Sequence, residues 1–234
     1  MSSSSTTTKS KKTRILLVRH GSTTLTVEDR FAGSTDVELG PEGEFQANAL
    51  AQRIKDTHIA AVYSSPMKRT MKTASILAAP HNLEINTMDG LKEIDHGHWE
   101  QKTRAEVEKE FPEEYAAWDA DPFTYAPQGG ETGLQVLTRA LPCIREIVAN
   151  HSGKTVLVVS HKATIRLLIG SFLGFDLRRY RDNLDQLPCC LNILDFTTHV
   201  PLQARLVLFN DISHYITCNI AEMPTPPRLS KAWQ

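Results

Sequence analysis

The stretch Ile15-Leu16-Leu17-Val18, which runs directly into Arg19-His20-Gly21, decides how the rest of the sequence is interpreted. Four consecutive apolar residues are typical of a strand that is buried on both faces, as strands in parallel sheets are. Val156-Leu157-Val158-Val159 repeats the pattern and continues into Ser160-His161. Both segments therefore predict buried parallel strands, each followed directly by charged or titratable side chains.

Strand and helix patterns alternate along the remaining chain. A further strand is predicted over 59–63, helices over 132–150 and 163–173, and closing strands over 192–196 and 204–209. Alternation of short apolar strands with amphipathic helices indicates an α/β fold: a three-layer sandwich with a mostly parallel central sheet. From about 91 to 128 the composition becomes acidic and aromatic, which favours a small helical insertion rather than a separate domain.

Length and composition narrow the class of protein. The 234 residues include 26 basic and 27 acidic side chains, for a net charge of −1, and 41% are hydrophobic. These values fit one globular domain, expected over 13–222, with a disordered N-terminal tail over 1–12 and a C-terminal tail over 223–234. The near-zero charge argues against a nucleic-acid partner, and no apolar run is long enough for a membrane span. We expect a cytoplasmic protein with reduced cysteines, and leave organelle targeting by the Ser/Thr-rich N-terminus open.

The strand ends carry the candidate chemistry. Arg19 and His20 follow the first strand, Arg69 follows the second, and His161 follows the Val156–Val159 strand. Ligands of open α/β sheets bind at the carboxyl ends of the strands. Two guanidinium groups suit a phosphate, and an imidazole can attack phosphorus as a nucleophile. The sequence has neither a GxxxxGK[ST] loop nor a cluster of Asp residues for magnesium.

An acid is also needed to protonate the leaving oxygen, and Glu93 in the segment Leu91–Gly97 is the candidate. The ordered motifs RHG, SSPxxRTxxTA, ExxxGxWE, GGE and SH resemble the histidine phosphatase superfamily, which contains phosphoglycerate mutases and many phosphatases. This resemblance spans about 14–196. It implies a histidine phosphatase-like α/β domain.

The resemblance also implies roles for individual residues. His20 would become phosphohistidine, Arg19 and Arg69 would hold the phosphoryl oxygens, His161 would stabilise the transferring group, and Glu93 would act as acid and then base. Neither a metal nor a cofactor would be required. The candidate substrate-binding residues are Thr26, Gly33, Ser34, His96 and Lys162.

Three of these positions leave alternatives open. Thr26 stands where the family often has Asn; its hydroxyl can still donate one hydrogen bond to phosphate, in a loop whose geometry need not match that of the family. His96 and His98 either shape the pocket or pack against Trp99. Lys162 either binds a carboxylate or second anionic group of the substrate, or is a solvated residue at the start of a helix.

The motifs favour a metal-independent phosphomonoesterase that acts on a small phosphorylated metabolite, phosphoserine-like or sugar-phosphate-like. The alternatives are a phosphoglycerate-mutase-type isomerase and a non-catalytic phospho-ligand-binding protein. The expected partner is a small-molecule phosphate monoester, and a homodimer is expected only by analogy with the family.

Overall fold

The computed structural model describes residues 12–197 and 202–216, and its centre is a six-stranded sheet. The strands are β1 (Lys12–Arg19), β2 (Ala61–Ser64), β3 (Ile85–Thr87), β4 (Thr155–Ser160), β5 (Leu191–Thr197) and β6 (Gln203–Asp211). Their order is β3-β2-β4-β1-β5-β6. The first four are mutually parallel, β5 is antiparallel to β1, and β6 is antiparallel to β5. The predicted α/β class with a mostly parallel sheet is confirmed.

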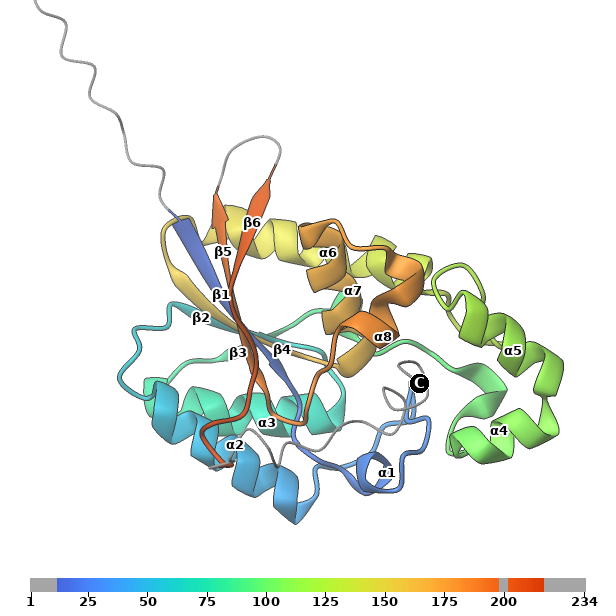
Figure 1. Ribbon diagram of the computed structural model, residues 1–234. Coiled ribbons are helices and arrows are strands. Elements are labelled where there is room, and N and C mark those ends of the chain that lie inside the picture. Colours follow the sequence, from blue (N-terminus) through green and yellow to red (C-terminus); the bar gives the residue numbers. More distant parts are fainter. Residues whose placement is uncertain (1–11, 198–201, 217–234) are drawn as a thin grey trace, which may run out of the picture.

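Helices lie on both faces of the sheet (Figure 1). They are α1 (Thr24–Val27), α2 (Pro41–Ile54), α3 (Lys68–Ala78), α4 (Arg104–Glu110), α5 (Pro112–Ala120), α6 (Gly133–Asn150), α7 (Lys162–Leu173) and α8 (Tyr180–Asn183). Single 3-10 turns occupy Ala79–His81, Asp89–Leu91, Gly97–Trp99 and Leu177–Arg179.

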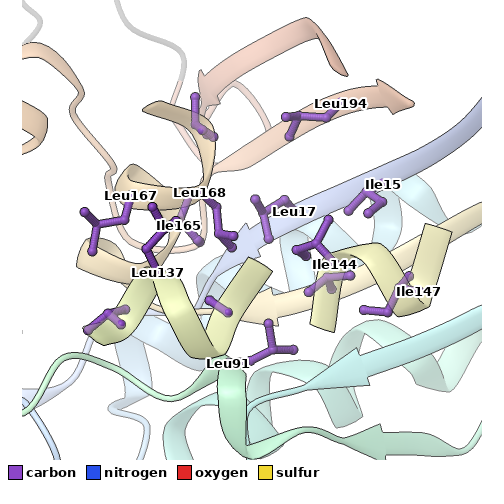
Figure 2. Packing of buried hydrophobic residues seen from close by; sticks show 14 of the residues in the cluster. Ile15, Leu17, Leu91, Leu137, Ile144, Ile147, Ile165, Leu167, Leu168 and Leu194 are labelled. Atoms are coloured by element: carbon purple, nitrogen blue, oxygen red, sulfur yellow. The ribbon is translucent and has the colours of Figure 1, made fainter. Parts of the chain in front are cut away.

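Side-chain alternation along β1 produces two apolar layers. Ile15 and Leu17 pack with α6 and α7, while Leu16 and Val18 pack with α2 and α3. Figure 2 shows the first of these layers, where Leu17 lies between Leu168 and Ile144. A strand whose both faces are covered needs an unbroken apolar run, which is what the sequence shows.

The α4–α5 region projects beyond the end of the sheet (Figure 1) and has an apolar cluster of its own. Phe31, Trp99, Val107 and Trp118 are its buried members. The helical insertion predicted over about 91–128 thus contains these two short helices. The loop that carries Phe31 joins the insertion to the sheet domain.

Element boundaries differ slightly from the sequence predictions. Strand β1 starts at Lys12, and β3 was not predicted because it is three residues long and only Ile85 is partly buried. Lys12, the last residue of the N-terminal tail expected over 1–12, begins β1 instead. The rest of that tail and the C-terminal tail expected over 223–234 lie outside the described residues, so the division into one domain and two tails stays a prediction. Within the described part of the chain, no helix is long and apolar enough to cross a bilayer.

Candidate active site

Two histidine rings meet where β1 and β4 end. Arg19 pairs with Ser160 in the parallel register, and the His20 amide donates to the Ser160 carbonyl at 3.0 Å. Consequently His20 and His161 are the first residues after the ends of two adjacent strands, and their ring centroids lie 5.2 Å apart. Both rings are buried. The strand register alone thus brings together residues 141 positions apart in the sequence.

The protonation of His20 follows from its hydrogen bond. Its Nδ1 lies 2.7 Å from the Gly21 carbonyl oxygen, which can only accept, so Nδ1 carries the proton and Nε2 keeps its lone pair. Burial, with Arg69 and Arg19 nearby, holds the pKa of His20 well below 6.5. The neutral ring is therefore a nucleophile at neutral pH. His161 is also neutral for the same reasons, and its Nε2 lies 2.8 Å from Ser65 Oγ.

Two guanidinium groups are held beside these rings by backbone carbonyls. Arg69 donates from Nη1 to Thr35 O at 2.7 Å and from Nη2 to Gly33 O at 2.8 Å. Arg19 donates from Nη1 to Gln186 O at 2.6 Å. Burial lowers the pKa of both arginines, because carbonyl oxygens orient a cation but do not neutralise it. A bound phosphate would supply the missing negative charge.

The turn after α8 closes the site around Arg19 and His20. Its Cys189 amide donates to His20 O at 3.1 Å, so the turn contacts both ends of the Arg19-His20 pair. The Gln186 side chain is fully buried and donates to Asn192 Oδ1 at 2.9 Å on β5. Cys189 and Cys190 are buried free thiols, as expected for reduced cysteines.

The Glu93 side chain, from the segment after β3, lies against the first turn of α7. Its two carboxylate oxygens accept from the amides of Thr164 and Ala163, each at 3.2 Å. Arg139 on α6 donates to the backbone carbonyl of Glu93 at 2.9 Å and is itself paired with Glu131 at 2.7 Å. The Glu of the Gly129-Gly130-Glu131 motif thus orients Arg139, which fixes the segment that carries Glu93.

A cavity of about 390 Å³ opens in front of these groups. Its lining includes eight of the ten predicted site residues: Arg19, His20, Thr26, Gly33, Arg69, Glu93, His96 and Lys162. His161 lies behind the wall, against His20. Ser34 is exposed outside the lining and donates through Oγ to Glu100 at 2.8 Å.

Comparison with known sequences decides the family. The sequence model described as "Histidine phosphatase superfamily (branch 1)" matches residues 15–211. This chain belongs to that superfamily. The predicted resemblance is confirmed, and the chain is a phosphoric monoester hydrolase of this group.

Relatives of this histidine phosphatase include characterised enzymes and solved structures. "Phosphoserine phosphatase 1" of Hydrogenobacter thermophilus is 36% identical over 167 residues, which are 71% of this chain and 79% of that protein. The YhfR structure from Bacillus stearothermophilus superimposes with a TM-score of 0.80 at 31% identity, covering 86% of this chain and 98% of that one. A mycobacterial glucosyl-3-phosphoglycerate phosphatase complexed with VO3 gives 0.76 at 27% identity, covering 84% and 98%.

The histidine phosphatase cavity also contains residues that the sequence analysis did not select. Arg166 on α7, Arg104 on α4, Arg181 on α8 and Trp118 on α5 all line it. Arg166 could have been found from its spacing, since it lies four positions after Lys162 on the same helix. Nothing in the sequence pattern indicates that Arg104 and Arg181 reach the cavity, because their elements come from the insertion and a short helix.

The two histidines of the acid segment differ in role. His96 lines the cavity and packs edge-on against Phe31, with centroids 4.7 Å apart, and burial lowers its pKa to about 3. His98 instead packs on Phe111 and lies 2.9 Å from Glu114, outside this cavity. Thr26 Oγ1 lies 2.9 Å from Thr23 Oγ1, the N-cap of α1.

The part of the chain that the structure describes contains no group of three or more His, Cys, Asp or Glu side chains able to hold a metal ion. The charges that face the cavity are mainly guanidinium groups. The expectation that no cofactor is needed stays a prediction.

Proposed function

We propose that this histidine phosphatase hydrolyses a small phosphate monoester through a phosphohistidine on His20 Nε2, without a metal ion. The orientation of His20 is the observation that carries the proposal. With Nδ1 bound to Gly21 O at 2.7 Å, the lone pair of Nε2 is available in a cavity that Arg19 and Arg69 also line.

The proposed reaction has two steps, formation of the phosphohistidine and its hydrolysis. Nε2 of His20 attacks phosphorus, the ester P–O bond breaks, and Glu93 gives its proton to the departing alkoxide oxygen. Water next attacks the phosphohistidine, Glu93 takes the water proton, and the N–P bond breaks to release inorganic phosphate. Arg19 and Arg69 hold the non-bridging oxygens throughout, because forked donors match their geometry.

His161 would stabilise the charge that develops on the transferring group. Its ring contacts His20 at 5.2 Å between centroids and is held by Ser65 Oγ at 2.8 Å. Thr26, Gly33, His96 and Lys162 line the space for the alcohol part of the substrate. Ser34 lies outside and contributes by binding Glu100.

The size of the cavity supports a small substrate. About 390 Å³ accommodates a phosphorylated metabolite rather than a folded phosphoprotein. The names of the relatives, phosphoserine phosphatase and glucosyl-3-phosphoglycerate phosphatase, describe substrates of the proposed class. A phosphoserine-like or sugar-phosphate-like ester is therefore the substrate we propose.

Trapping of the covalent intermediate tests this mechanism. Enzyme mixed with ³²P-labelled phosphoserine and quenched in alkali should carry label on His20, and His20→Ala should lose the label and roughly 10⁴–10⁶-fold of kcat. His58→Ala, at an exposed position, is the matched control and should keep both. Full turnover by His20→Ala would overturn the proposal.

Two further measurements on the same enzyme distinguish metal-free hydrolysis from a metal-dependent reaction and from a mutase. EDTA should leave the rate unchanged, and a loss that added metal restores would contradict the metal-free route. Positional analysis of the products of 3-phosphoglycerate should show free phosphate. Transfer of phosphate to the neighbouring hydroxyl would instead support a mutase.

A further inference from the structure

The cavity is lined by an excess of cations. Seven basic side chains face it, with two carboxylates: Arg19, Arg30, Arg69, Arg104, Lys162, Arg166 and Arg181, against Asp29 and Glu93. Two of the seven, Arg19 and Arg69, are assigned to the phosphoryl group in the proposed mechanism. The remaining five exceed what one phosphate monoester requires.

Three of the five have acidic partners of their own. Arg30 binds Glu28 at 2.6 Å. Arg104 lies 3.6 Å from Asp29. Arg181 lies 3.1 Å from the Asp119 carboxylate. Each of the three arginines is therefore already paired with a carboxylate in the absence of a ligand.

Lys162 has no such acidic partner among the described residues, and Arg166 has one that a backbone amide also binds. They lie one turn apart on α7, and both line the cavity. Within the described residues the Lys162 ammonium group makes no hydrogen bond or ion pair. Arg166 is only 9% exposed, and its Nε has no hydrogen-bond partner. Its single carboxylate contact, Asp185 at 3.1 Å, is shared with the Gln186 amide.

We propose that Lys162 and Arg166 form a second anion subsite, which binds a carboxylate or second phosphate on the same substrate molecule whose phosphoryl group reacts at His20. This inference rests on the proposed function and narrows its substrate to phosphomonoesters with a second anionic group. The first turn of α7 presents Lys162 immediately after His161, so the subsite adjoins the reacting centre.

Electrostatics support the same assignment. Burial and the charges of Arg166 and Arg19 lower the pKa of Lys162 to about 7, while burial lowers that of Arg166 to about 10. Asp185 is the acid that counteracts both shifts, and Arg104 adds to the repulsion. A bound anion would relieve this repulsion and keep Lys162 protonated.

A matched pair of substrates tests the subsite. Phosphoserine and phosphoethanolamine differ by one carboxylate, and the wild-type enzyme should prefer phosphoserine in kcat/KM. Lys162→Met should lower kcat/KM for phosphoserine about 10- to 100-fold, the range of one charge-assisted hydrogen bond, and change that for phosphoethanolamine less than about threefold. Lys162→Arg should restore most of the preference.

A second pair distinguishes the two kinds of anion. Propane-1,3-diol bisphosphate is compared with propane-1,3-diol monophosphate in wild-type enzyme and Lys162→Met. A larger preference in this pair identifies a phosphate subsite, and a larger preference in the phosphoserine pair identifies a carboxylate subsite. Arg30→Gln, which removes a cation already held by Glu28, is the control and should affect all four esters equally.

Two results would overturn the subsite. One is a wild-type enzyme with no preference in either pair, and the other is a Lys162→Met variant that loses activity equally on all esters. p-Nitrophenyl phosphate, which has no second anion, separates this failure from a failure of the proposed function. Its hydrolysis with labelling of His20 would continue if only the subsite were wrong.

Discussion

The two halves of the active site are held in place by different means. His20 and His161 follow adjacent buried strands, and the parallel register with its apolar layers places them. Glu93 and Arg69 instead depend on loops tied by carboxylates: Glu131 through Arg139 on one side, and Glu100 through Ser34 on the other. Apolar packing therefore positions the nucleophile His20, whereas polar networks position the acid Glu93 and the phosphate-binding Arg69.

Among variants of the two polar networks, Glu93→Gln should cause the largest loss of kcat. Loss of the acid should lower kcat for phosphoserine by about 10²–10⁴-fold, since general acid catalysis contributes that much. The loss should be smaller for p-nitrophenyl phosphate, whose leaving group needs no protonation. Steady-state kinetics on the two esters measure the difference.

The controls for Glu93→Gln concern folding and labelling. Gln keeps one oxygen that accepts from the first turn of α7, but its NH2 group faces the second backbone amide, so the thermal midpoint should fall while unfolding stays cooperative. Covalent labelling of His20 by p-nitrophenyl phosphate should persist. Equal slowing on both esters would remove Glu93 from the acid role.

The polar network behind the acid is tested by Glu131→Gln. Arg139 now donates to both Glu131 oxygens, at 2.9 and 2.7 Å; the substitution leaves one oxygen and removes the negative charge, so the segment that carries Glu93 would shift. We expect a loss of kcat of roughly 10- to 100-fold for phosphoserine, because a small displacement of a catalytic group has that effect. The leaving-group dependence should resemble that of Glu93→Gln.

Glu100→Gln is the matched control in the other network. It weakens the bonds to the loop that carries Gly33 and Thr35, whose carbonyls hold Arg69. Its effect should fall on phosphate affinity, as a raised KM on both esters with an unchanged leaving-group dependence. If the two variants gave the same kinetic pattern, the two networks would not act on separate groups.

The smallest effect is a dependence of stability on pH. His96, in the insertion, is neutral when folded because its pKa is lowered to about 3, and an unfolded histidine titrates near 6.5. Between these values the unfolded state binds more protons, so the free energy of unfolding should fall as the pH drops below 6.5. The slope contributed by one such histidine reaches about 1.4 kcal/mol per pH unit.

Urea unfolding at pH 7.5, 5.5 and 4.5 measures this slope. His20 and His161 act in the same direction, since their pKa values are also lowered. Burial also lowers the pKa of His81, His151 and His214, so His96→Phe removes one of six such histidines among the described residues and should reduce the slope by the contribution of one histidine. An unchanged slope would show that His96 does not contribute to the acid sensitivity.

Much of the sheet side could be predicted from the sequence. The runs Ile15–Val18 and Val156–Val159 identify buried strands because a strand covered on both faces must be apolar throughout. Their sharp ends at Arg19-His20 and Ser160-His161 place polar groups where such sheets bind ligands. The histidine phosphatase motifs then indicated Glu93.

The insertion side was less predictable because its contacts join distant segments. Arg104 and Arg181 face the cavity only through the packing of α4, α5 and α8, which no local periodicity encodes. Ser34 was expected beside the substrate, yet its hydroxyl binds Glu100. His96 and His98 looked alike in the sequence, and only the apolar cluster around Phe31 separates them.

The turn around Gln186 has a consequence for how activity arises during folding. Arg19 near the start of the chain is held by a carbonyl 167 positions later, and the turn is anchored to β5. Loop closure over such a separation is slow compared with local helix formation. Phosphate binding should therefore return in the last kinetic phase of refolding, after most of the helical signal, when β5 completes the sheet.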